Sequence, residues 1–238
     1  MKKIIYIFLF GLFFLFFETK LCGTFTIMID PAGDSQYAGR LLEDCLERGI
    51  TSQFVQSLQK KLLQSIADIK VFFTRRPGEA IGHLQNANFS NRLDVDFYLS
   101  IHFYKEKEVK PRMYMYTFSY NDDFVRAKPG LYFYPYDKAH IIHRTETKAL
   151  ANVAKEVFLS ETHKKMFDFQ GMISLPFKPL IGVKAPAIGV EIGLKKKDDW
   201  HDYVDVFVEV ISNIVNKPFD TPVYASSTRL RATSGYSG

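Results

Sequence analysis

The chain has 238 residues, of which 47% are hydrophobic and 24% are charged, and its formal net charge is +5. This size and composition are typical of one globular domain and exclude a disordered or fibrous chain. The charge is mild and no lysine- or arginine-rich tract is present, so we do not expect a nucleic acid partner. Of the two cysteines, Cys22 lies in a segment that we expect to be removed or lipidated. No intramolecular disulfide is therefore expected for the remaining Cys45.

The N-terminal segment has the pattern of a secretory signal. Lys2 and Lys3 precede an unbroken apolar run, Ile4–Phe17, which is shorter than the roughly 20 residues of a membrane span. We predict that residues 1–23 are a signal peptide or an N-terminal anchor, with lipidation of Cys22 as an alternative. This segment would be the only part of the chain to touch a membrane. The protein would be exported to the periplasm or cell envelope.

The first predicted elements alternate between strand and helix. A buried strand over 25–30 ends at a turn that begins with Pro31. Apolar residues at helical spacing predict an amphipathic helix over 48–66. The next predicted elements are a strand over 69–74, a looser helix over 81–92 and a strand over 96–102. This alternation indicates a parallel sheet with right-handed crossovers.

The pattern after residue 102 is less regular. We predict a strand over 113–118, a loop over 121–130, a short aromatic run over 131–134, a helix over 145–160, a strand over 186–192 and a closing helix over 203–215. Residues 24–220 are thus expected to form one α/β domain, a three-layer α/β/α sandwich around a mostly parallel sheet of about six strands. The Ser/Thr/Gly-rich residues 221–238 are expected to be a disordered tail.

Three polar residues, Asp30, His102 and Glu191, each stand within or at the end of an apolar run. The C-terminal ends of parallel strands converge on the ligand crevice of an α/β sheet. Glu47 lies just before the first predicted helix, so Glu47, His102 and Glu191 can reach one patch. A hydrolytic zinc site needs three protein ligands and an open position for water, with a nearby carboxylate to move the proton. These residue types therefore predict a metal-dependent hydrolytic site.

Each of these residues also has a simpler interpretation. Asp30 could serve only to cap the turn at Pro31, and His102 could be an ordinary histidine at a strand end. Glu47 could be a solvated residue whose charge suits the N-terminus of a helix. Glu191 carries the strongest signal, because a carboxylate inside an apolar strand is costly unless it is paired or functional.

The ordered motifs of the chain resemble those of the zinc-dependent N-acetylmuramoyl-L-alanine amidases known as the amidase type 3 family. The matching segments are Asp30–Asp34, Glu47, Thr74-Arg75, Ser100–His102 and Pro186–Gly193. The last of these fits the family pattern Pro-Ala-x-x-Val-Glu-x-Gly. The resemblance runs from Phe25 to about Lys217. It implies an α/β core and hydrolysis of the amide between N-acetylmuramic acid and L-alanine in peptidoglycan.

The resemblance also implies roles for individual residues. Glu47 and His102 would bind zinc, and Glu191 would be the catalytic acid/base. The family's first histidine ligand is replaced by Gly33, so we expect the neighbouring Asp34 to supply an oxygen ligand instead. Other residues that could supply a ligand are His83, His140 and His143. Asn86 also departs from the family pattern, which usually has arginine at that position.

Two functions follow from these expectations. The first, which we prefer, is an exported peptidoglycan hydrolase that uses metal-activated water. The alternative is a catalytically dead protein of the amidase fold that binds the cell wall or a partner protein. The missing histidine supports the alternative, whereas the retention of Glu47, His102 and Glu191 supports the hydrolase. A different metal-dependent hydrolase on the same scaffold is a third possibility, because a fold does not fix a substrate.

Overall fold

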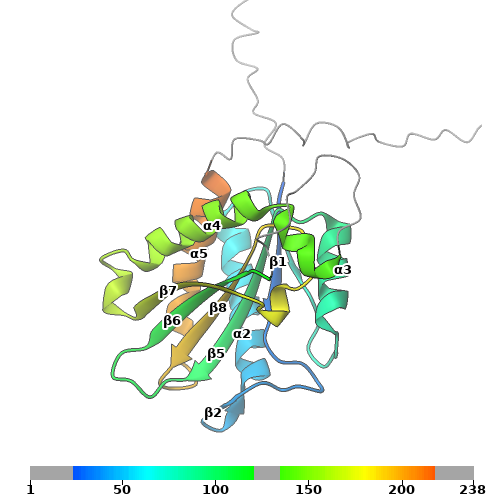
Figure 1. The fold of residues 1–238 in the computed structure, drawn as a ribbon. Coiled ribbons are helices and arrows are strands. Elements are labelled where there is room, and N and C mark those ends of the chain that lie inside the picture. The colour runs from blue at the N-terminus through cyan, green and yellow to red at the C-terminus, as the bar shows by residue number, and fades with distance from the viewer. Residues whose placement is uncertain (1–23, 121–134, 218–238) are drawn as a thin grey trace, which may run out of the picture.

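The computed structural model describes residues 24–120 and 135–217 (Figure 1). The predicted signal segment at 1–23, the loop and aromatic run at 121–134 and the tail at 221–238 lie outside the described residues. Within the two described ranges, no helix combines the length and the apolar character that crossing a membrane requires.

A sheet of six strands forms the centre of the fold, in the spatial order β4-β1-β5-β8-β6-β7. Its strands are β1 (Phe25–Pro31), β4 (Ile69–Phe73), β5 (Phe97–Lys105), β6 (Arg112–Phe118), β7 (Asp168–Leu175) and β8 (Ala187–Leu194). All neighbouring strands are parallel except β6 and β8, which are antiparallel. A separate two-stranded ladder joins β2 (Leu41–Leu42) to β3 (Cys45–Leu46). The prediction of a mostly parallel sheet is confirmed.

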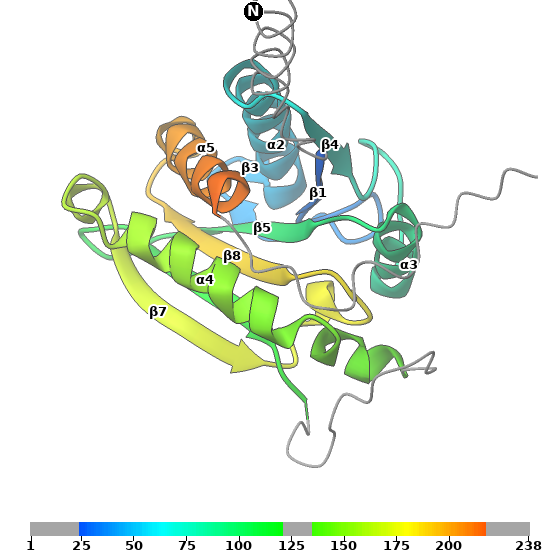
Figure 2. The same ribbon diagram turned by 90° about the horizontal axis from the view of Figure 1, so that it is seen from above.

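Helices cover both faces of the sheet, as the predicted three-layer sandwich requires (Figures 1 and 2). One face carries α2 (Glu47–Ser65), α4 (Arg144–Phe158) and α5 (His201–Asn216). The other face carries α3 (His83–Leu93) and the short 3-10 helix η4 (Lys178–Leu180). Two further 3-10 helices are η2 (Tyr136–Ile141) and η3 (His163–Lys165).

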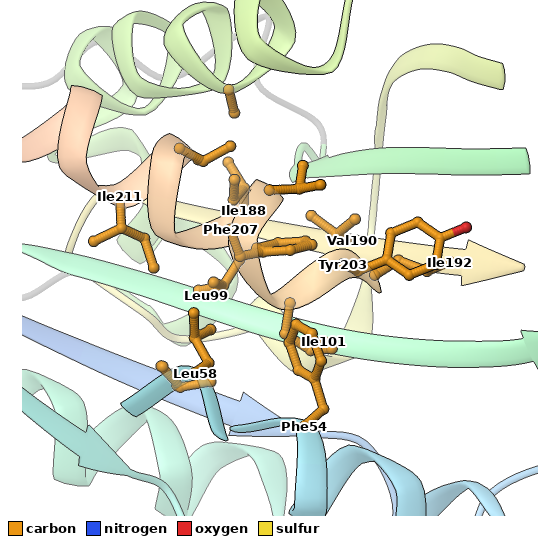
Figure 3. Close-up of a cluster of buried hydrophobic side chains, with 14 of the residues drawn as sticks. Phe54, Leu58, Leu99, Ile101, Ile188, Val190, Ile192, Tyr203, Phe207 and Ile211 are labelled. Carbon is orange, nitrogen blue, oxygen red and sulfur yellow. The ribbon is translucent and has the colours of Figure 1, made fainter. Parts of the chain in front are cut away.

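The larger hydrophobic core lies between the sheet and α2, α4 and α5 (Figure 3). At its centre, the ring of Phe54 packs edge-on against Phe103 and Phe207, with ring centroids 5.3 and 5.6 Å apart. Successive strand residues point to opposite faces. Leu99 and Ile101 of β5 therefore enter this core, and the alternate residues Tyr98 and Ser100 face the α3 side. This alternation leaves the α3 face free for polar side chains at the C-terminal end of the sheet.

Among the strands, the edge strand β7 and the ladder of β2 and β3 were not predicted from the sequence. The edge strand β7 has mostly exposed residues, so it lacks the regular apolar alternation that identifies a half-buried strand. The ladder of β2 and β3 rests on only two residues in each strand, too few for any periodic pattern to appear. β7 is held by backbone pairing to β6, which is distant in sequence. β2 and β3 pair with each other across a tight turn.

Candidate functional site

The structure brings together three of the predicted site residues at the C-terminal end of the sheet. His102 of β5 and Glu191 of β8 are direct partners in the parallel register of these strands. Glu47 is the first residue of α2, and its Oε1 lies 3.7 Å from Nδ1 of His102. The carboxylates of Glu47 and Glu191 are close enough to interact electrostatically. A residue from a helix start and two from strand ends thus form one cluster.

Both carboxylate oxygens of Glu47 accept hydrogen bonds from backbone N–H groups. Oε1 accepts from Phe103 at 2.9 Å, and Oε2 accepts from Arg40 at 3.0 Å. The loop approaches so closely that a Cβ on Gly39 would lie 2.7 Å from Oε2, and Gly39 has a φ of 79°. Burial raises the pKa of Glu47. The Glu47 side chain therefore ties the loop after β1 to the end of β5.

Glu191 is paired with an arginine that sequence reasoning did not identify. Nη2 of Arg40 donates to Oε1 of Glu191 at 2.5 Å, and the Tyr116 hydroxyl donates to Oε2 at 2.7 Å. Burial alone would raise the pKa of Glu191, but the hydrogen bonds from Tyr116 and Arg40 outweigh burial and lower that pKa. Glu191 is thus an ionised carboxylate with a donor on each oxygen.

His102 is held as a neutral imidazole. Ser100 donates its hydroxyl proton to Asp30 at 3.1 Å, so its oxygen can accept a hydrogen bond from Nε2 of His102 at 3.0 Å. This chain of hydrogen bonds favours the tautomer with the proton on Nε2, in which Nδ1, 3.7 Å from Oε1 of Glu47, is unprotonated. Burial lowers the pKa of His102 to about 4.

Asp30 anchors this chain by accepting four side-chain hydrogen bonds. Its Oδ1 accepts from Thr74 at 2.7 Å and from both Arg75 and Asn86 at 3.2 Å, and its Oδ2 accepts from Ser100. Asn86 is buried and supplies one of these donors. Asp30 acts on the site by positioning Ser100, which in turn orients the ring of His102.

The turn after β1 that carries the predicted ligand Asp34 is built around a glycine. Gly33 has a φ of 77°, and a Cβ there would lie 2.7 Å from Cβ of Arg48. Oδ1 of Asp34 accepts the backbone N–H groups of Gln36 at 2.8 Å and Tyr37 at 2.6 Å. The Asp34 carboxylate closes its own turn in this structure, and its role as a metal ligand stays a prediction.

Among the residues that the structure describes, the donor set falls one ligand short of a three-ligand hydrolytic zinc site. Across residues 24–120 and 135–217, no three His, Cys, Asp or Glu side chains are grouped so that they could hold a metal together. Glu47 and His102 supply two donors, one fewer than such a site needs. The cation that the cluster does contain is the guanidinium of Arg40, which interacts with both Glu191 and Glu47. His83, His140 and His143 are not part of the cluster.

Aromatic rings form the wall beside these polar groups. Phe177 stacks on Tyr116 with a centroid distance of 4.7 Å and meets the ring of His102 edge-on at 5.2 Å. Gly189 makes room for this wall, since a Cβ there would lie 2.5 Å from the Phe177 ring. A glycine inside an apolar strand is a sequence signal for such a close approach. No comparable signal marks Arg40, whose contact depends on the path of the loop.

Comparison with known proteins finds one matching family model and several similar solved structures. The family model for N-acetylmuramoyl-L-alanine amidase matches residues 27–204. Similar solved structures include the catalytic domain of the amidase CwlV from Bacillus (Paenibacillus) polymyxa var. colistinus, with 15% identity and a TM-score of 0.58 over 80% of this chain and 96% of that one. Another is AmiC2 of Nostoc punctiforme, with 16% identity and a TM-score of 0.55 over 81% and 94% of the two chains.

A third is Ami1 of Mycobacterium smegmatis, with 14% identity and a TM-score of 0.55 over 82% of this chain and 98% of that one. At these identities the structural likeness shows a shared fold. No curated protein sequence matches the chain. Because the family model spans most of the described residues, the chain belongs to the N-acetylmuramoyl-L-alanine amidase family.

Proposed function

We propose that this chain is exported and binds peptidoglycan at the Arg40–Glu191 cluster without hydrolysing it. The family is zinc-dependent and acts on peptidoglycan, which supports the choice of ligand. The observation that carries the proposal is the 2.5 Å ion pair between Arg40 and Glu191. It occupies the carboxylate that was expected to act as acid/base, at a cluster to which the described residues supply no third metal ligand.

The electrostatics of Glu191 argue against a role in proton transfer. A general base needs a free oxygen within reach of the proton and a pKa close to the working pH. Both oxygens of Glu191 accept hydrogen bonds, and its pKa is lowered from a value that is already acidic. Glu191 is therefore suited to hold Arg40 and Tyr116 in place, as part of a rigid recognition surface.

The same groups are suited to recognition of an amide-rich glycopeptide. Binding sites for such molecules combine aromatic walls with a few fixed polar groups. The aromatic wall is supplied by Phe177 and Tyr116, and the guanidinium of Arg40 lies 6.0 Å from the ring centroid of Tyr104. The Arg40 side chain is 49% exposed, so its remaining donors can reach a ligand carbonyl or carboxylate.

Hydrolysis of the amide between N-acetylmuramic acid and L-alanine is the second candidate. It is favoured by the pairing of Glu47 and His102, because the unprotonated Nδ1 of His102 faces a carboxylate oxygen 3.7 Å away. Two acceptor atoms this close are a typical fragment of a metal site. In this case Glu47 and His102 would hold zinc, Asp34 would be the third ligand, and Glu191 would be the acid/base after release from Arg40.

One experiment separates the two candidates. The full chain is mixed with purified peptidoglycan, with added zinc or with a chelator, and both co-sedimentation and the release of peptides with a free alanine amine are measured. We expect co-sedimentation under both conditions, no released peptide, and weaker binding by Arg40→Gln. Lys155→Gln, on the distant helix α4, is the control and should bind normally. Zinc-dependent release that is lost in Glu191→Gln would replace this proposal with the hydrolase.

A further inference from the structure

A cavity of about 1340 Å³ lies at the edge of the sheet, beside the candidate site. It is formed by the start of α2, the end of the edge strand β4, the segment that follows β4, and α3. Figure 2 shows β4 at the edge of the sheet with α2 and α3 on either side of it. The cavity is larger than the roughly 300–1,000 Å³ of typical ligand pockets.

The loop after β1 separates this cavity from the Arg40–Glu191 cluster. Gly33 and Asp34 of that loop line the cavity, whereas Arg40 of the same loop contacts Glu191. The first two residues of α2 likewise belong to different sites. Glu47 belongs to the cluster, and Arg48 lines the cavity. The two sites are therefore neighbours with different walls.

The cavity has an excess of positive charge. Its lining includes four arginines: Arg48, Arg75, Arg76 and Arg92. The acidic lining residues Asp34 and Glu79 use carboxylate oxygens to accept backbone N–H groups of their own turns. Among the described residues, no ion pair involves Arg48, Arg76 or Arg92, and only Arg75 is neutralised, by Asp30.

Two of these arginines are fixed in position. Arg75 is almost fully buried, with its side chain 8% exposed, and it donates to Asp30 at 3.2 Å and to the carbonyl of Gly33 at 3.0 Å. Arg48 donates to the carbonyl of Asp34 at 3.2 Å. Arg48 and Arg75 therefore form a fixed part of the wall, whereas Arg76 and Arg92 are exposed and their side chains are open to a ligand.

The rest of the lining is apolar and aromatic. Phe72 at the end of β4 and Phe89 of α3 are half-buried and line the cavity on the α3 side of the sheet, whereas Phe73 lines it on the α2 side. A guanidinium binds carboxylates and phosphates through two parallel hydrogen bonds, and it prefers them to neutral acceptors. The lining therefore suits a molecule with an oxyanion at one end and an apolar or sugar face at the other.

We propose that this cavity binds a carboxylate- or phosphate-bearing ligand carried on a sugar or short-peptide body. The oxyanion would contact Arg76 and Arg92, and the body would pack on Phe72 and Phe89. The inference does not depend on the function proposed for the Arg40–Glu191 cluster. The choice of probes rests on the proposed export, since a cell envelope contains two sources of such groups, namely the carboxylates of peptidoglycan peptides and the phosphates of glycerol phosphate polymers.

The test measures binding of two probes to the full chain by isothermal titration calorimetry. Muramyl dipeptide represents the carboxylate source and glycerol 3-phosphate the phosphate source. We expect saturable binding of at least one probe, and at least tenfold weaker binding by the double variant Arg76→Gln, Arg92→Gln. The matched control, Lys60→Gln with Lys155→Gln, removes the same charge outside the cavity and should leave affinity unchanged. The probe that binds identifies the source.

Three outcomes would overturn the inference. They are no saturable binding of either probe, equal weakening by the arginine and lysine variants, and loss of binding in Arg40→Gln but not in the arginine double variant. The last outcome would move the ligand to the Arg40–Glu191 cluster. Conversely, cavity binding that survives Arg40→Gln stands even if the protein does not bind intact peptidoglycan, so the two proposals can fail separately.

Discussion

At the scale of single residues, Gly33 and Arg40 decide what the site can do. Gly33 has the left-handed φ of 77° that favours glycine, and any side chain at this position would need Arg48 to move. Arg40 brings a positive charge onto Glu191.

Substitution of Gly33 tests how tightly this turn is built. Gly33→Ala should lower the free energy of unfolding by about 1–3 kcal/mol, because the new Cβ is strained and collides with Arg48. The control is Gly49→Ala in α2, where a Cβ meets nothing within 4 Å. That control should gain up to about 1 kcal/mol from helix propensity. Urea denaturation measures both, and equal stability of the two variants would show that the turn is loose.

The Arg40–Glu191 ion pair should be visible in a titration. Arg40→Gln should raise the pKa of Glu191 toward its usual range, because one of the two hydrogen bonds that lower it is removed. Carbon-13 NMR of the Glu191 carboxyl group measures this pKa, with Arg48→Gln as the control. An unchanged pKa would mean that the ion pair does not persist in solution.

The same ion pair has a consequence for stability. A carboxyl whose pKa is lower in the folded protein stabilises the fold above its unfolded pKa, and that contribution is lost as the pH falls through the folded pKa. Glu191 should therefore contribute to acid unfolding below the ordinary carboxyl pKa. In Arg40→Gln this acid-dependent contribution should be smaller, and a denaturation series from pH 7 downward would record the difference.

At the scale of elements, Glu47 connects three parts of the chain. It begins α2, and its carboxylate accepts N–H groups from the loop after β1 and from β5. Oε2 also lies against Gly39, which needs a φ of 79° to come so close. The element that carries the site is therefore the whole connection from β1 to α2, including the ladder of β2 and β3.

Hydrogen exchange tests this role of Glu47. Glu47→Gln replaces one acceptor oxygen with an NH₂ group, so one of the two backbone bonds must be lost. We expect faster exchange at the amide of Arg40 or Phe103, with unchanged exchange at Val71 in β4 as the internal control. If all three amides keep their rates, the carboxylate is not what holds the loop.

The elements themselves were largely predictable from the sequence. Strong apolar periodicity identified the helices that became α2, α4 and α5 and the buried strands β1, β5 and β8, with ends within a few residues of the observed ones. Strand ends then placed His102 and Glu191 at one edge. Arg40, Tyr116 and Phe177 could not be found in this way, because their positions depend on loop paths and on a strand order that local sequence does not encode.

At the scale of the whole molecule, the site is the end of a sheet held rigid by its core. The four strands β4, β1, β5 and β8 are parallel, while β6 and β7 run in the opposite direction. Tyr116 reaches Glu191 from β6, the neighbour of β8 in the sheet. The alternation of helix and strand predicted the α/β class and the mostly parallel sheet. It could not predict that β8 would lie between β5 and β6, which brings Glu191 beside His102.

The core prediction concerns Phe207 of α5, which is fully buried against Phe54. Phe207→Ala should cost about 3–5 kcal/mol of unfolding free energy, since it leaves a cavity between α2, α5 and the sheet. Leu63→Ala changes a side chain that is 55% exposed on α2 and should shift stability by less than about 0.5 kcal/mol. Thermal unfolding of both variants would check the difference, and similar losses would contradict the core as described.

The proposed function rests on Arg40 as the cation of this site in place of zinc. The most direct measurement is zinc content by mass spectrometry of the full chain after zinc loading and dialysis, beside His102→Ala and Asp34→Ala. We predict no stoichiometric zinc in the wild type and no difference between it and the variants. One zinc per chain that is lost in both variants would contradict the proposal and restore Asp34 as the third ligand of a hydrolase.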